Sequence, residues 1–68
     1  MKFEKIGGSG SCSQYSLYDY TESPFGVTVM SIEIHRESEN WWFVGQPKSS
    51  MNKAHMIALY EFLNTVLS

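Results

Sequence analysis

The sequence predicts an α+β fold in which an antiparallel sheet of three to four strands packs on one C-terminal helix. Short alternating segments occupy most of the chain, a Gly-Gln-Pro break follows at 45–47, and the last segment repeats apolar residues at helical spacing. With 68 residues, the chain has room for one small domain, residues 1–68. A domain of this size hides only about 60% of its unfolded surface, so each large apolar side chain matters.

The N-terminal part of the chain predicts two strands. Lys2–Ile6 alternates between polar and apolar side chains, and Ser13–Tyr20 does the same. The stretch between them, residues 7–12, is rich in glycine and serine. Because glycine carries the highest backbone entropy, we expect a flexible loop there.

Gly26–His35 is the strongest strand candidate, since it is rich in β-branched residues. Its apolar residues alternate from Met30 onward, so Met30, Ile32 and Ile34 define the face toward the helix. Val27 and Val29 fall out of phase with that set. We expect both faces to be covered at the beginning of the strand, and a β-bulge near Val29 and Met30 is the alternative.

The stretch Trp41–Val44 predicts a further strand, joined to the preceding one by a hairpin loop of about four or five polar residues. Successive side chains in a strand point to opposite faces, so the two adjacent tryptophans cannot enter the same core. We expect Trp42 and Val44 to face the helix. Trp41 and Phe43 are then expected to face outward.

The C-terminal segment predicts a helix from about Met51 to Leu67, capped by Ser49 or Ser50. Apolar residues cover about half of its circumference, which is more than one sheet face requires. His55 lies at the centre of this apolar stripe, where an unpartnered polar ring is costly. We expect it to bond a backbone group in the first helical turn, and a titrating or metal-binding ring is the alternative.

Composition narrows the class of function. The chain is 43% hydrophobic and 18% charged, which favours a folded domain. Its five basic residues are scattered and the net charge is −2, so a basic patch for phosphate is not displayed. The single cysteine excludes an internal disulfide and is compatible with a reducing compartment. We expect a cytoplasmic location, because the sequence shows neither a signal peptide nor a long apolar run.

The sequence contains no catalytic or cofactor signature, so we expect neither an enzyme nor a cofactor or metal site. Cys12 would need a histidine within hydrogen-bond reach to act as a nucleophile, and a lone loop cysteine is more often an exposed thiol. Glu33 and His35 share the outer face of the central strand. A sheet this small offers no evident deep cleft in which their pKa values could be tuned.

We interpret the outer sheet face as a protein-binding surface, because Trp and Tyr dominate interface energetics. The expected partner is a larger protein with a basic surface, since acidic residues gather near one turn. An inhibitor or adaptor of this kind resembles in general style the small antagonists that bacteriophages make against host or defence proteins. The expected contact residues are Trp41, Phe43, Tyr18, Tyr20, Glu33, His35, Glu37 and Glu39.

Two alternative functions follow from other features. The order strand, strand, strand, helix over Ser13–Leu63 resembles the C-terminal part of a double-stranded-RNA-binding domain, which implies RNA binding. The positions that match the family's last helix are Ser50, Ala54, Ala58 and Leu63. Met51 and Asn52 stand where that family has paired lysines, and its N-terminal helix has no counterpart in the Gly/Ser stretch. An obligate homodimer is the second alternative, suggested by the wide apolar arc and the small size.

Overall fold

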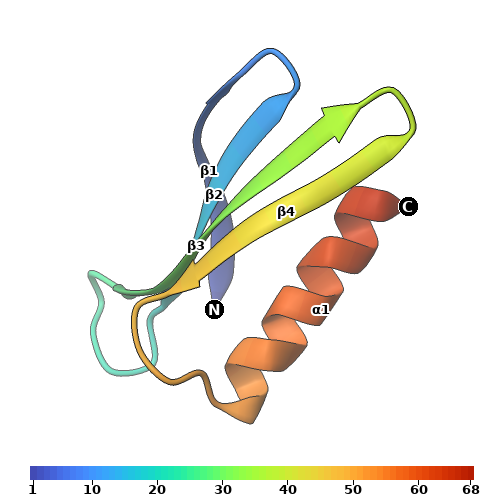
Figure 1. Ribbon diagram of the computed structural model, residues 1–68. Helices are drawn as coiled ribbons and strands as arrows, with labels where there is room; N and C mark the ends of the chain where they lie inside the picture. Colours follow the sequence, from blue (N-terminus) through green and yellow to red (C-terminus); the bar gives the residue numbers. More distant parts are fainter.

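Four strands and one helix make up the chain in a computed structural model that describes residues 1–68 (Figure 1). The elements are β1 (Lys2–Ser9), β2 (Cys12–Asp19), β3 (Val27–Glu37), β4 (Asn40–Pro47) and α1 (Lys53–Leu67). The strands form one antiparallel sheet in the order β1-β2-β3-β4, so each strand pairs with its neighbour in the sequence. The predicted α+β class, with an antiparallel sheet and a C-terminal helix, is confirmed.

The hairpin between β1 and β2 turns through only two residues, Gly10 and Ser11. Gly10 has φ 58°, a left-handed conformation that glycine adopts at no steric cost. The flexible loop expected over residues 7–12 is therefore wrong, since only Gly10 and Ser11 lie outside the strands. Residues 7–9 pair with β2, whose first residue is Cys12. Here the backbone hydrogen bonds between β1 and β2 offset the conformational entropy that the glycines lose on folding.

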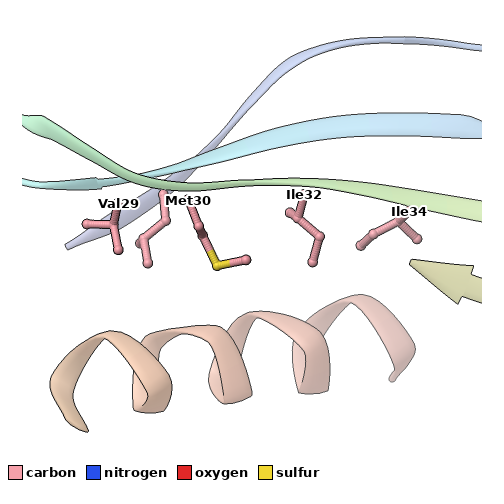
Figure 2. Close-up of a cluster of buried hydrophobic side chains, with 5 residues drawn as sticks. Val29, Met30, Ile32 and Ile34 are labelled. Carbon is pink, nitrogen blue, oxygen red and sulfur yellow. The ribbon is translucent and has the colours of Figure 1, made fainter. Parts of the chain in front are cut away.

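A β-bulge interrupts β3 at Val29. Leu17 pairs with Met30, and the next residue of β2, Tyr18, pairs with Thr28, so Val29 has no partner in the register. The extra residue lets both Val29 and Met30 enter the core, as Figure 2 shows. The expectation that both faces are covered there is wrong, and the bulge accounts for the pattern.

The core lies between the sheet and α1. In Figure 2 the labelled side chains of β3 point toward the helix. Five hydrophobic residues are buried: Leu17, Val29, Met30, Ile32 and Ile34. The helix adds half-buried side chains, of which none is fully buried: Ala58, Leu59, Phe62, Leu63 and Val66. Only six of 68 residues are buried in total, so each core side chain supplies a large share of the stability.

Phe62 attaches α1 to the β1 and β2 side of the sheet. Its ring stacks on that of Phe3 with centroids 4.1 Å apart, and it meets Tyr15 edge-on at 4.8 Å. Such aromatic pairs add stability beyond the area that they bury. The eight residues of β4, by contrast, are all exposed. The helix thus covers the part of the sheet around β1, β2 and β3 and leaves β4 open.

Helix α1 begins at Lys53 with a capping box. The Oδ1 atom of Asn52 accepts a hydrogen bond from the backbone N–H of His55 at 2.9 Å. The Nδ1 atom of His55 accepts one in return from the backbone N–H of Asn52 at 3.3 Å. The expected cap by Ser49 or Ser50 is therefore wrong. The expectation that His55 bonds a backbone group in the first turn is confirmed.

Candidate functional site

The register between β3 and β4 decides which way the paired tryptophans face. Trp41 lies opposite Arg36, Trp42 opposite His35, and Phe43 opposite Ile34. Directly opposed residues of an antiparallel pair share a face of the sheet. Trp41 and Phe43 are therefore on the side of the helix, while Trp42 is on the outer face.

The expected faces of the two tryptophans are thus inverted. The hairpin turn consists of Ser38 and Glu39 alone, because β3 continues to Glu37 and β4 begins at Asn40. This turn is shorter than the predicted loop of four or five residues. Since side chains alternate along a strand, the register set by this turn determines every face in β4.

Lying on the helix side does not bury Trp41 or Phe43. Trp41, Trp42, Phe43 and Val44 are 41–52% exposed, because α1 packs toward the other strands. A groove of about 130 Å³ runs between β4 and the C-terminal part of α1, and only hydrophobic residues line it. They are Ile34, Trp41, Trp42, Phe43, Leu63, Val66 and Leu67. We call residues 41–44 together with this groove the β4 surface.

Charged side chains border the β4 surface at the tip of its hairpin. The guanidinium of Arg36 lies over the ring of Trp41, 4.8 Å from its centroid, which holds the indole by a cation–π contact. Glu37 ends β3, and Glu39 lies in the turn; both are exposed. This end of the apolar surface therefore carries two carboxylates and one guanidinium, which leaves it net acidic.

A second group of side chains gathers on the outer face, which we call the outer-face cluster: Cys12, Glu33 and His35. Cys12 lies directly opposite His35, and Glu33 precedes His35 by two residues on the same face. The Nε2 atom of His35 is 3.8 Å from the Cys12 Sγ and 3.2 Å from the Glu33 Oε2. A thiol, an imidazole and a carboxylate thus converge on one point.

Two neighbours position the outer-face cluster. The amide of Gln14 donates a hydrogen bond to the Oε1 atom of Glu33 at 3.0 Å, which orients the carboxylate. The ring of Trp42 stacks on that of His35, with centroids 5.2 Å apart and planes 3° from parallel. Each of these two β3 side chains is thus oriented by a residue of a neighbouring strand: Glu33 by Gln14 of β2, and His35 by Trp42 of β4.

The predicted contact residues do not form one surface. Glu33 and His35 lie together, beside Trp42 instead of the expected Trp41. Tyr18 pairs with Thr28, near the opposite end of β3 from His35, and its ring lies 6.3 Å from that of Tyr20. Because β2 runs antiparallel to β3, the end of β2 that carries Tyr18 lies beside the start of β3. The tyrosines are therefore far from His35 and from the hairpin tip.

Sequence reasoning did not single out Gln14, expected Trp42 to face the helix, and expected Cys12 to be an exposed thiol in a loop. Cys12 is instead half-buried at the start of β2. The alternation of β3 already placed Glu33 and His35 on one face, so that half of the cluster was visible. The other half depends on the pairing of β2 with β3, which sequence spacing does not reveal.

At the other end of the sheet, Asp19 joins β2 to the start of α1. The Nδ1 atom of His55 accepts the Asn52 N–H, so its Nε2 is the atom that donates to the Asp19 Oδ2, at 2.9 Å. The backbone N–H and the hydroxyl of Thr21 donate to the Oδ1, at 2.9 and 2.7 Å. The His55 hydrogen bond, followed by those from Thr21, lowers the pKa of Asp19 well below its ordinary value.

The lowered pKa of Asp19 predicts an acid-dependent loss of stability. A carboxyl whose pKa is depressed by folding stabilises the native state above its unfolded pKa, about 3.9, and loses that contribution as the pH falls toward the folded value. We expect the free energy of unfolding, measured by urea titration, to fall more steeply below about pH 5 in the wild type than in Asp19→Asn. Thr21→Val, which removes one donor, should give an intermediate slope. Identical slopes in all three proteins would contradict the role of Asp19.

Comparison of the chain with protein-family models, with curated proteins and with solved structures gives no match. The sole helix has 15 residues, and no helix is long and apolar enough to cross a membrane. The β4 surface and the outer-face cluster are the two features of the molecule that point to a function.

Proposed function

We propose that the protein is a non-enzymatic protein-binding module, an inhibitor or adaptor that occupies a surface of a larger protein through the β4 surface. One observation supports this most: four consecutive large apolar side chains, Trp41–Val44, stand 41–52% exposed. Trp41 and Phe43 on the helix side continue into the groove with Leu63, Val66 and Leu67, and contiguous exposed apolar surface of this kind on a small protein usually marks an interaction site. Tryptophan is also the residue type most enriched among interface hot spots.

The position of β4 at the edge of the sheet favours the same function. β4 has a neighbouring strand, β3, on one side only, so part of its backbone is free to pair with another chain. Partners that add a strand to such an edge gain affinity from main-chain hydrogen bonds and specificity from pockets for alternate side chains. The apolar groove beside β4 is a pocket of that kind.

Charge indicates what the partner presents next to β4. Glu37 and Glu39 are exposed at the hairpin tip, and the chain has a net charge of −2. A partner with basic side chains near the hairpin tip would match these carboxylates, which speeds encounter and fixes orientation. The proposed contact therefore combines an apolar centre with an acidic end. Tyr18 and Tyr20 lie outside it.

The experiment compares capture by the wild type with capture by variants of the β4 surface. Immobilised wild type, Phe43→Ala and Trp42→Ala are incubated with lysate at several salt concentrations, and the bound protein is identified, purified and titrated. A hot-spot truncation costs about 2 kcal/mol or more, or roughly a 30-fold loss of affinity. Phe25→Ala is the matched control, since Phe25 is 91% exposed and lies outside the β4 surface.

We expect one stoichiometric protein to bind the wild type and Phe25→Ala and to be lost from the two β4 variants. Equal capture by all four proteins would overturn the β4 surface as the contact site. Recovery of RNA in place of a protein would overturn protein binding and support the RNA-binding alternative.

A homodimer is the second candidate, and the edge position of β4 favours it too. Two copies of an edge strand can pair antiparallel about a two-fold axis, which would join the two sheets. Light scattering during size exclusion separates the cases. If the wild type is a dimer and Phe43→Ala is a monomer, the partner of the β4 surface is a second copy of this chain. A monomeric wild type excludes the homodimer.

A further inference from the structure

We propose that Cys12, Glu33 and His35 bind a divalent transition-metal ion, with Zn²⁺ as the best fit, on the outer face of the sheet. These three residues are not part of the β4 surface. Trp42 belongs to the β4 surface and also stacks on His35, but none of the three ligands belongs to that surface, so the proposal goes beyond protein binding and is tested without changing Trp42.

The separations between the donor atoms suit a tetrahedral ion. The three ligand atoms all lie within 4.8 Å of one another. The Nε2 atom of His35 lies 3.8 Å from the sulfur and 3.2 Å from the Glu33 oxygen. Zinc bonds of about 2.0–2.3 Å place tetrahedral ligands about 3.3–3.6 Å apart. The two pairs that include the His35 Nε2 need shifts of only a few tenths of an ångström, whereas the Cys12 sulfur and the Glu33 oxygen, which lie within 4.8 Å, need to approach each other further as the ion binds.

The way in which the three groups converge favours metal binding over nucleophilic catalysis. In a catalytic triad the nucleophile contacts one ring nitrogen of the histidine and the carboxylate contacts the other. Here the Cys12 thiol and the Glu33 carboxylate both approach the same nitrogen, Nε2 of His35. Glu33 cannot then orient the ring for proton transfer from Cys12. Convergence of three donors on one point is instead what a metal ion requires.

The donor set also matches the charge and softness of zinc. One sulfur, one imidazole nitrogen and one carboxylate oxygen are all ligand types that Zn²⁺ accepts. With the thiol ionised, Cys12 and Glu33 supply two negative charges, which balance the ion. All three ligands are half-buried, so solvent reaches them, and water or a partner's side chain could supply a fourth ligand.

The surroundings of the three ligands resemble the outer shell of a metal site. Gln14 holds the Glu33 oxygen that does not face His35, and Trp42 fixes the plane of the His35 ring. Outer-shell contacts of this kind orient the ligands and raise metal affinity. The ligands themselves stand on the two central strands, β2 and β3, where paired backbone limits their movement.

Cobalt(II) and zinc(II) are the probes that test the site. Chelator-treated protein, kept reduced with a phosphine, is titrated with Co²⁺ and the near-ultraviolet thiolate-to-cobalt band is recorded, followed by displacement with Zn²⁺ and calorimetry. We expect one equivalent to bind the wild type with a thiolate band. Cys12→Ser should abolish the band, and His35→Gln should weaken Zn²⁺ binding by more than the about 10- to 100-fold that an outer-shell change costs.

Two further variants distinguish a specific site, whose neighbouring residues orient the ligands, from nonspecific binding of the ion. Gln14→Ala should weaken Zn²⁺ binding by about 10- to 100-fold and keep the thiolate band. Glu61→Gln, which changes an exposed acid of α1 outside both the cluster and the β4 surface, should bind as the wild type does. Circular dichroism of each metal-free variant verifies that it is folded. The absence of a thiolate band in the wild type, or wild-type Zn²⁺ affinity in folded Cys12→Ser and His35→Gln, would overturn the site.

Discussion

Replacement of Ile32 by alanine is expected to lower the free energy of unfolding by about 2 to 5 kcal/mol. Ile32 is 1% exposed and lies at the centre of β3, under the helix. Its truncation removes apolar contacts and leaves a cavity that the sheet cannot close. A chain of 68 residues has a total stability of about 3–10 kcal/mol at the usual range per residue, so the variant should be largely unfolded or melt far below the wild type.

Ile57→Ala is the matched control for this prediction. Ile57 is 46% exposed on α1, so the same chemical change there should shift the stability by less than about 0.5 kcal/mol. Thermal and urea unfolding of both variants measure the difference. If the two variants unfold at the same temperature and urea concentration, α1 does not cover Ile32 on this face of the sheet.

Phe62→Ala is expected to cost about 2 to 3 kcal/mol, less than the about 3–5 kcal/mol of a fully buried phenylalanine, because Phe62 is half-buried. The change removes the stack on Phe3 and the edge contact with Tyr15, the two aromatic contacts through which α1 is attached to β1 and β2. Loss of these contacts should loosen the helix as a unit. Urea unfolding measured by circular dichroism gives the value.

Phe25→Ala serves as the control for Phe62→Ala, since Phe25 is 91% exposed in the segment between β2 and β3. We expect its stability to stay within about 0.5 kcal/mol of the wild type. Wild-type melting of Phe62→Ala would show that α1 does not pack through this side chain.

The elements of the fold were predictable because alternation and helical spacing are local properties of the sequence. Ile32 and Ile34 show this, since their spacing alone placed them on the face toward the helix, where the structure buries them. Boundaries and turns were less predictable. Gly7 has a high backbone entropy, yet pairing with β2 keeps it in a strand. The N-cap is Asn52 and not Ser49 or Ser50, because the Asn52 side chain accepts a hydrogen bond from the His55 N–H.

The candidate sites were harder to predict, since they depend on how the strands pair. Trp41 and Trp42 had to lie on opposite faces, but the two-residue turn that decides which one faces the helix has no unambiguous signal in Ser38 and Glu39. Glu33 and His35 were visible as neighbours on one face. The approach of Cys12 to them follows from the β2 and β3 register alone.

Amide hydrogen exchange with and without the captured partner tests the central claim, that β4 is the contact strand. The protein is exchanged alone and in the complex, and protection is compared strand by strand. We predict slower exchange over residues 41–44, because a bound partner excludes water from the β4 surface and pairs with its free edge. Protection confined to the region of Tyr18 and Tyr20, or to the exposed side of α1, with β4 unchanged, would contradict it.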